Sequence, residues 1–202
     1  IRQLPDGVEI MRIITGSARG CRLKTPKGQE TTRPTSDRVK ESLFNILGQM
    51  VLDRTVLDVF AGTGNLGLEA LSRGAASAVM VDRATAELIG DNARLTRLQD
   101  KVVVKAGDVF SELGRLSTGG AQFDLIFCDP PYHRGLWEKT LQTIDGSTGL
   151  MAANGILVIE HGADENDLPE LSRLVRVMNR RYGHTTQLSF YQWQDYVREV
   201  DS

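Results

Sequence analysis

Short apolar runs alternate along the chain with stretches in which apolar residues recur every three or four positions. The apolar runs predict strands over residues 56–60, 78–81, 102–105, 123–128 and 155–160. The periodic stretches predict helices over residues 34–47, 66–73, 84–98 and 136–144. Because parallel strands are apolar on both faces and are joined by helical crossovers, this alternation indicates an α/β fold with helices on both faces of a parallel sheet.

Two regions depart from this alternation. Residues 174–177 and 185–193 predict two strands without a helix between them, and we expect these to pair as an antiparallel hairpin at one edge of the sheet. Residues 12–25 predict two short strands around a glycine-containing turn. We therefore divide the chain into a basic N-terminal β-hairpin extension over residues 11–34 and an α/β domain over residues 35–202. We interpret residues 1–10, which precede Met11, as an extended start or a cloning remnant.

The composition is that of a soluble globular protein, and it excludes disordered, collagen-like and membrane-spanning chains. Hydrophobic residues make up 41% and charged residues 25% of the 202 residues, and no run approaches the ~20 apolar residues of a transmembrane helix. Cys21 and Cys128 are too few for a disulfide framework and form no CxxC pair. We therefore expect a cytoplasmic protein, and nothing in the sequence requires more than a monomer.

The formal net charge of −2 conceals a basic N-terminal region. Residues 11–40 contain eight basic side chains and two acidic ones. A basic arm on an acidic body suggests an anionic partner, with nucleic acid as the leading case. From charge alone, a solvated surface without any partner is an equally good interpretation.

A glycine-rich loop follows the first strand of the predicted parallel sheet. Gly62, Gly64 and Gly67 form a GxGxxG pattern between that strand and a helix, which is the context of a nucleotide-binding loop. Asp82 ends the next strand, where a carboxylate can accept hydrogen bonds from two ribose hydroxyls. On their own, these features also fit a dinucleotide, or a tight strand–helix turn with a purely structural role.

Two further carboxylates bear on the identity of the ligand. Asp58 lies inside the first strand, where dinucleotide-binding strands are usually apolar, and a buried carboxylate needs a partner. The cationic methionine end of S-adenosylmethionine is one candidate partner, and a neighbouring donor with a structural role is the alternative. Asp108 follows the third strand and is placed to hydrogen-bond an adenine amino group beside Val109, or to cap the following helical turn.

The most specific motif is Asp129-Pro130-Pro131-Tyr132, which follows a buried strand and so lies at the carboxyl edge of the sheet. The two prolines stiffen the loop and remove two N–H groups. The Asp129 carboxylate and the Pro130 carbonyl can both accept hydrogen bonds from an exocyclic amine, while Tyr132 can stack on a flat ring. Such a loop suits methylation of a weakly nucleophilic amine conjugated to a base, because acceptors stabilise the positive charge that develops on the nitrogen.

Other candidate residues carry less weight. The three histidines, His133, His161 and His184, lie singly without metal-ligand spacing, and we predict no metal site. We interpret Cys128 as a small buried hydrophobe and Trp137 as a packing residue.

Together, these motifs resemble those of amino-methyltransferases that depend on S-adenosylmethionine, and most closely the RsmD family, which methylates N2 of one guanine in 16S ribosomal RNA. The resemblance extends over nearly the whole chain from Met11. It rests on residues 12–20 (RIITGSARG), 33–47 (RPTSDRVKESLFNIL), 58–74, 129–132 and 181–185 (RYGHT).

The resemblance implies a Rossmann-like seven-stranded methyltransferase sheet, mostly parallel, with an antiparallel C-terminal edge hairpin and an N-terminal β-hairpin. Ribosomal RNA is the implied partner, within a 30S subunit or its assembly intermediate. Catalytic roles are implied for Asp129, Pro130, Pro131 and Tyr132. S-adenosylmethionine binding is implied for Asp58, Gly62, Thr63, Gly64, Asn65, Asp82, Arg83, Asp108 and Val109. Phosphate contacts are implied for Arg12, Arg19, Arg22, Lys24, Arg33 and Arg38.

Other functions stay open from the sequence. An enzyme with the same chemistry would suit DNA adenine, DNA cytosine or a protein glutamine. A non-catalytic RNA-binding module would show the same basic arm, and a nicotinamide-dependent oxidoreductase the same glycine loop. The placement of Asp58 and the absence of an evident hydride-transfer set of His or Tyr and Lys make the oxidoreductase the weakest of these alternatives.

Overall fold

The computed structural model describes residues 11–26, 34–147, 149–165 and 167–200, which contain one seven-stranded sheet. The strands are β1 (Thr55–Val59), β2 (Ser77–Asp82), β3 (Val102–Ala106), β4 (Phe123–Cys128), β5 (Met151–Gly162), β6 (Leu174–Tyr182) and β7 (Thr186–Trp193). The α-helices are α1 (Pro34–Leu47), α2 (Asn65–Ser72), α3 (Ala86–Leu95), α4 (Val109–Thr118), α5 (Leu136–Asp145) and α6 (Gln194–Val200). Two short 3-10 helices, η1 (Gly48–Val51) and η2 (Gln99–Lys101), complete the order.

The strand order is β3-β2-β1-β4-β5-β7-β6. The first five strands of this order are parallel, whereas β7 runs antiparallel to both β5 and β6. The predicted fold class and the C-terminal edge hairpin are therefore confirmed. Because the chain extends from β1 to one side and later from β4 to the other, the topological switch point lies between β1 and β4. Open α/β sheets bind ligands beyond the carboxyl ends of the strands at such a point.

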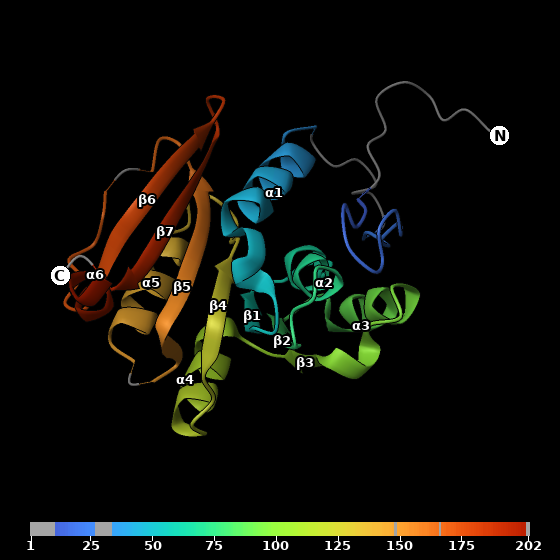
Figure 1. Ribbon diagram of the computed structural model, residues 1–202, viewed down its shortest axis with the longest axis horizontal. Coiled ribbons are helices and arrows are strands. Elements are labelled where there is room, and N and C mark those ends of the chain that lie inside the picture. Colours follow the sequence, from blue (N-terminus) through green and yellow to red (C-terminus); the bar gives the residue numbers. More distant parts are fainter. Residues whose placement is uncertain (1–10, 27–33, 148, 166, 201–202) are drawn as a thin grey trace.

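Helices cover both faces of the sheet (Figure 1). On one face, Leu43 of α1, Leu68 of α2 and Ile89 of α3 belong to one buried apolar cluster. On the other face, Leu113 of α4 and Leu141 of α5 belong to a second cluster. Because successive strand residues point to opposite faces, the apolar strands contribute to both clusters. This explains why the strands read as continuous apolar runs in the sequence.

The N-terminal segment, residues 11–26, packs against α2 and α3 (Figure 1). Ile13, Ala18 and Leu23 are buried in the cluster that α1, α2 and α3 share with the sheet. Within the described part of this segment, Arg12 and Arg22 form a single antiparallel bridge, and no longer strand is present. The two predicted strands are thus reduced to one bridged pair, because side chains of α2 take up backbone N–H groups that a ladder would use.

Two helices were not predicted from the sequence, α4 and α6. α4 begins directly after Asp108, whose Oδ1 accepts a hydrogen bond from the N–H of Ser111 at 3.0 Å. α4 has 10 residues, as many as α3 and α5, and it contains Gly114, whereas α6 is only 7 residues long. Within the described residues, every helix is too short or too polar to cross a membrane.

Candidate active site

Three carboxylates from three neighbouring strands come together at the carboxyl edge of the sheet. Asp58 lies in β1, Asp129 directly follows β4, and Glu160 lies near the end of β5. The register pairs Cys128 with Ile159, so Asp129 and Glu160 occupy the next facing positions on adjacent strands. Adjacent strands lie about 4.8 Å apart. The three carboxylates therefore share one small region beside the switch point.

These carboxylates line a cavity of about 310 Å³ on the side of the sheet that α1 and α2 cover. The glycine loop forms another wall of the cavity. Other residues that line it are Met11, Pro26, Lys40, Phe60, Ala61, Gly62, Thr63, Asn65, Leu66 and Thr85. Five residues of the implied cofactor set are outside this lining. Gly64 lies in the glycine loop itself, and Asp82, Arg83, Asp108 and Val109 lie at the ends of β2 and β3.

The glycine loop has the backbone geometry that its glycines predict. Gly62 and Gly64 have φ angles of +57° and +80°, in the left-handed region that favours glycine. A Cβ on Gly67 would lie 2.5 Å from the Cε of Met80, so this glycine permits close packing of α2 on β2. A Cβ on Gly62 would meet nothing closer than 4.0 Å, which leaves its surface open toward a ligand.

Asp58 has a partner inside the protein as well as access to the cavity. Its Oδ2 accepts a hydrogen bond from the N–H of Gly67 at 2.9 Å, near the start of α2. Burial, opposed by the hydrogen bond from Gly67 and supported by the nearby charge of Asp82, raises the pKa of Asp58 to about 7. A nearby cation would therefore lower the pKa of Asp58 and favour its ionised form.

Asp82 shapes the loop that the ligand would contact. Its Oδ2 accepts a hydrogen bond from the N–H of Gly62 at 3.0 Å, and its Oδ1 accepts from the N–H groups of Ala84 and Thr85 at 2.8 and 3.0 Å. Arg83 is exposed beside it. Asp82 thus ties the glycine loop to the start of the segment that leads into α3.

Asp108, which follows β3, caps the helix after it, one of the two roles considered from the sequence. This exposed carboxylate caps α4 through Ser111, and that hydrogen bond contributes most of the lowering of its pKa. Val109 is buried in the cluster beneath α4 and α5. Phe110 lies edge-on to Phe60, with ring centroids 6.3 Å apart. An aromatic pair therefore connects the start of α4 to the cavity wall.

Within the Asp129–Tyr132 loop, Asp129 lines the cavity and Tyr132 contacts Glu160, another lining residue. Tyr132 donates its hydroxyl hydrogen to Oε1 of Glu160 at 2.7 Å and lies 3.3 Å from the hydroxyl oxygen of Thr186. The protein groups crowded around the Asp129 carboxylate raise its pKa well above the ordinary value, and Glu160 and Asp58 add to the shift. The Asp129 residue nevertheless remains open to solvent at the cavity mouth, which leaves it accessible to an incoming base.

Glu160 is a site residue that the sequence reasoning missed. Burial raises its pKa, and the hydrogen bond from Tyr132 acts in the opposite direction. A signal for it was present, because a carboxylate near the end of the strand adjacent to β4 must lie near the Asp129 loop. The sequence alone did not establish which strands are adjacent.

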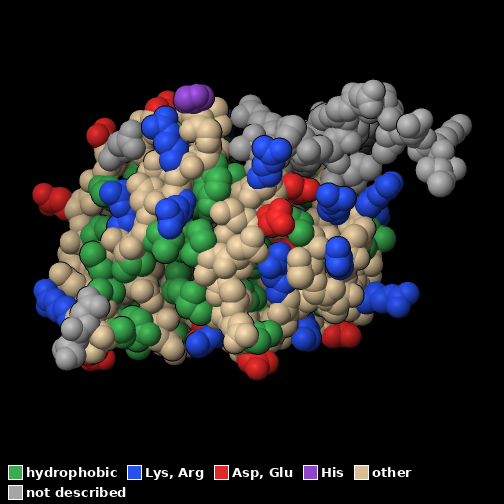
Figure 2. Space-filling view, turned by 45° about the horizontal axis from the view of Figure 1, so that its top comes forward, with side chains coloured by type: hydrophobic (Ala, Val, Ile, Leu, Met, Phe, Trp, Pro, Cys, Tyr) green, Lys and Arg blue, Asp and Glu red, His purple; other side chains and the backbone are tan. Residues whose placement is uncertain are grey.

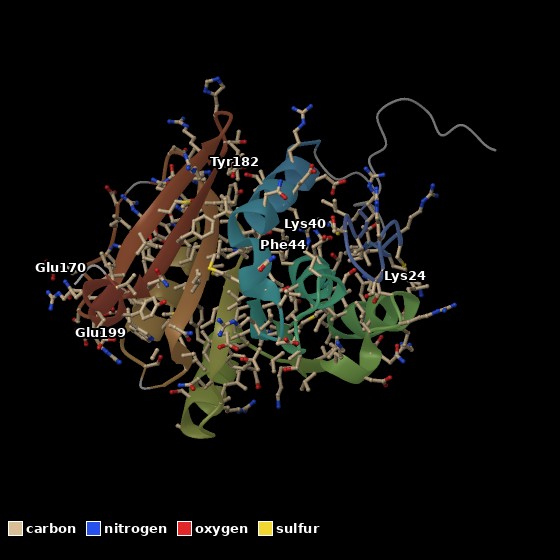
Figure 3. The ribbon with its side chains drawn as sticks, in the orientation of Figure 1. Lys24, Lys40, Phe44, Glu170, Tyr182 and Glu199 are labelled. Atoms are coloured by element: carbon tan, nitrogen blue, oxygen red, sulfur yellow. The ribbon has the colours of Figure 1, made fainter. Side chains whose placement is uncertain are left out.

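Lys40 is a second missed residue, which the sequence showed only as one of many basic side chains. Its Nζ lies 3.5 Å from Oε2 of Glu69 and donates hydrogen bonds to Oδ1 of Asn65 and the carbonyl of Arg12, both at 2.6 Å. Burial lowers the pKa of Lys40, whereas Glu69 raises it. Figure 3 shows Lys40 on α1, on the side near α2, where it holds Asn65 and the N-terminal segment together.

The predicted phosphate-binding residues differ in their surroundings. Arg12 lies 3.6 Å from Asp37, and Lys24 lies 2.8 Å from Asp91, so both charges are partly compensated. Three others, Arg19, Arg22 and Arg38, are exposed and form no ion pair with the described residues, whereas Arg33 lies outside those residues. Figure 2 shows Lys and Arg side chains spread around a small group of acidic side chains on one face.

Three minor predictions also have structural outcomes. His161 is buried, stacks on Trp137 with ring centroids 4.5 Å apart, and forms hydrogen bonds to the Gly162 carbonyl and the Ser189 hydroxyl. It is therefore a satisfied core histidine. Trp137 and Cys128 are buried in the cluster beneath α5, as their packing interpretation predicted.

The chain is similar to known proteins over most of its length. The family model described as conserved hypothetical protein 95 matches residues 11–192. The chain is 38% identical over 161 residues to Ribosomal RNA small subunit methyltransferase D of Escherichia coli strain K12, which covers 79% of this chain and 78% of that protein. It is 32% identical over 165 residues to the protein of the same name from Haemophilus influenzae, which covers 81% and 84%. The solved structure of yhhF from Escherichia coli matches with a TM-score of 0.76 at 33% identity, covering 92% of this chain and 98% of that chain.

Proposed function

This chain belongs to the RsmD family, and on that premise we propose that it transfers a methyl group from S-adenosylmethionine to the exocyclic N2 amine of a guanine in 16S ribosomal RNA. One observation carries the proposal: Asp129, at the start of the Asp129–Tyr132 loop, and the glycine loop line the same cavity at the switch point of the sheet. A methyl donor on one side and an amine held by acceptors on the other would thus lie within reach of each other.

The cavity suits the methionine end of S-adenosylmethionine, which supplies a methyl group already activated by its positive sulfur. Thr85 lines the cavity, and its buried Oγ1 has no hydrogen-bond partner among the described residues, so a polar ligand group would satisfy it. Asp58 faces the same cavity and would interact favourably with an ammonium group. Asp82 and Arg83 would flank the ribose, and Asp108 and Val109 the adenine, beyond the cavity itself.

The Asp129–Tyr132 loop would hold the guanine. The Asp129 carboxylate and the Pro130 carbonyl accept hydrogen bonds from the two N–H groups of the N2 amine. These bonds draw the nitrogen out of conjugation with the ring. Because the pKa of Asp129 is raised, this carboxylate is also a better acceptor for the proton that N2 must lose than an ordinary aspartate. Tyr132 stacks on the base, and Glu160 and Thr186 hold its hydroxyl group in place.

The basic surface would bind the phosphates of a 30S subunit or its assembly intermediate, with the enzyme acting as a monomer. Arg19, Arg22 and Arg38 are the strongest candidates, because they are exposed and form no ion pair with the described residues. The target guanine must be splayed out of its stack to reach the cavity, which is easier in a loop than in a helix.

The test is incubation with methyl-labelled S-adenosylmethionine and 30S particles from a strain lacking the modification, followed by digestion to nucleosides. We expect label in N2-methylguanosine, and Asp129→Ala should lower the labelling rate at least about 100-fold, as for loss of a transition-state acceptor. Asp100→Ala, an exposed aspartate of η2, is the matched control and should label normally. Equal labelling by wild type and Asp129→Ala, or label in N6-methyladenosine or in protein, would refute the proposal.

A further inference from the structure

Glu160 has a second carboxylate oxygen that the hydrogen bond from Tyr132 does not use. It follows Ile159, which pairs with Cys128, and it therefore lies beside Asp129 on the adjacent strand. Both carboxylates line the cavity. Tyr132 occupies Oε1 of Glu160, and Oε2 forms no hydrogen bond with the described residues.

Two adjacent carboxylates are costly unless a ligand supplies donors to both. Like charges on neighbouring groups repel, and each carboxylate oxygen is an acceptor only, when ionised. The surrounding protein groups raise the pKa of both carboxyls, and repulsion from Glu160 adds to the shift of Asp129. A ligand that offers two neighbouring N–H donors would relieve both effects.

Among the bases with an exocyclic amine, guanine alone presents two adjacent donors, N1–H and the N2 amine. Adenine and cytosine place an acceptor, N1 or N3, next to their exocyclic amine, and this acceptor would face a carboxylate. A site that leaves buried polar groups unpaired rejects the wrong ligand strongly.

We propose that Glu160 accepts a hydrogen bond from the N1–H of the target guanine while Asp129 accepts from the N2 amine. Glu160 is then the residue that selects guanine over adenine and cytosine. The inference rests on the proposed function, since it assumes that the exocyclic amine is held by the Asp129–Tyr132 loop.

The experiment compares two bases at the position that the wild-type enzyme modifies. Splint-ligated 16S rRNA carries either guanine or 2-aminopurine there and is assembled into 30S particles. 2-Aminopurine keeps the 2-amino group but has an acceptor at N1. We expect wild type to methylate guanine about 10- to 100-fold faster than 2-aminopurine, the range for a hydrogen bond to a charged group.

Glu160→Gln should reverse much of that preference. The Gln amide can donate to N1 of 2-aminopurine, so the guanine to 2-aminopurine rate ratio should fall at least tenfold relative to wild type. Tyr132→Phe removes the hydroxyl group that donates to Glu160, and Thr186→Val removes the hydroxyl group beside that of Tyr132. Both variants keep the Glu160 carboxylate and should keep the wild-type ratio. Thermal melting and binding of S-adenosylhomocysteine verify that each variant is folded.

The outcomes separate the two claims. If the wild-type enzyme methylates no guanine, the proposed function fails. If it methylates guanine but Glu160→Gln leaves the base ratio unchanged, Glu160 does not contact N1, and Asp129 alone spans both donors. If Tyr132→Phe changes the ratio as much as Glu160→Gln does, Glu160 acts only by positioning Tyr132. Either of the last two results overturns the inference while leaving the methyltransferase assignment intact.

Discussion

Asp58 shows how one residue can serve the site at the expense of the fold. Its charged form is buried in β1, and its pKa is raised from 3.8 to about 7. A raised carboxyl pKa contributes stability that is complete below the unfolded value, near 3.8, and is lost as the pH rises through 7. Above pH 7 the folded protein therefore carries an unfavourable buried charge, which a cationic ligand would stabilise.

We expect Asp58→Asn to be more stable than wild type at pH 8. The Asn carbonyl oxygen can still accept the hydrogen bond from Gly67, while the buried charge is removed. The gain in unfolding free energy should be at most about 4 kcal/mol, since one pKa unit corresponds to about 1.4 kcal/mol. Chemical denaturation at about pH 8 and about pH 4 measures it. The difference should vanish at the lower pH, and the exposed control Asp100→Asn should show none at either pH; a variant less stable at both would contradict this account.

The same carboxylate should make cofactor binding depend on pH. Between about pH 5.5 and 7, affinity for S-adenosylhomocysteine should rise by up to about tenfold per pH unit, because its ammonium group favours ionised Asp58. Above pH 7 the affinity should level off. Isothermal titration calorimetry across this range measures the effect, and Asp58→Asn should bind more weakly with little pH dependence. A flat wild-type profile would show that Asp58 does not face the ammonium group.

At the residue scale, the sequence revealed the members of the site that stand in motifs. The turn chemistry of Gly62 and Gly64 and the position of Asp129 follow from local patterns. Glu160 and Lys40 carry no motif, because their importance comes from neighbours on other elements. Only the strand order and the packing of α1 on α2 bring them to the cavity.

At the scale of elements, Glu69 of α2 connects three parts of the structure. Its Oε2 accepts a hydrogen bond from the N–H of Ile14 at 2.7 Å, and its Oε1 accepts from the N–H of Thr15 at 3.0 Å. The same fully buried carboxylate lies 2.7 Å from Arg73 and 3.5 Å from Lys40. The N-terminal segment is thus fixed to the body of the protein by a buried ionic group.

We expect Glu69→Ala to lower the free energy of unfolding by about 3–5 kcal/mol, because it leaves the buried charge of Lys40 without its partner. Urea denaturation measures the change. Glu87→Ala removes an exposed glutamate of α3 and should stay within about 0.5 kcal/mol of wild type. A loss for Glu69→Ala no larger than that of Glu87→Ala would show that the N-terminal segment is held by its apolar contacts alone.

The elements predicted from sequence are those with strong periodicity or uninterrupted apolar character. β1, β4 and α1 belong to this group, and the structure places them where the pattern indicated. α4 was missed because Asp108 was weighed mainly as a ligand residue, although the same carboxylate caps that helix. The N-terminal strands were overestimated because the N–H groups of Ile14 and Thr15 donate to Glu69 of α2 instead of extending the pairing of the two arms, which no local pattern shows.

At the scale of the whole molecule, the switch between β1 and β4 determines where chemistry can occur. Alternating strands and helices in the sequence predict a parallel sheet, and a parallel sheet has one edge where its loops gather. The order of the strands within the sheet does not follow from the sequence pattern and was established by the structure. The basic residues of the N-terminal segment and of α1 lie on the side of the sheet that bears the cavity, as a substrate with many phosphates requires.

We expect the double variant Arg19→Ala, Arg38→Ala to bind 16S rRNA more weakly and with a smaller salt dependence. Each lost phosphate contact should reduce the slope of log affinity against log salt by roughly 0.7–0.9. Filter binding at several salt concentrations measures this slope. Lys101→Ala, at the opposite, amino edge of the sheet before β3, is the matched control. An unchanged slope in the double variant would place the RNA on another surface.

The central claim is that the glycine loop and the Asp129–Tyr132 loop hold donor and acceptor on either side of one cavity. A crystal structure with S-adenosylhomocysteine tests it most directly. The account predicts the ammonium group near Asp58 and the sulfur facing Asp129 and Tyr132 across the cavity. A sulfur atom directed away from that loop, toward the opposite edge of the sheet, would contradict it.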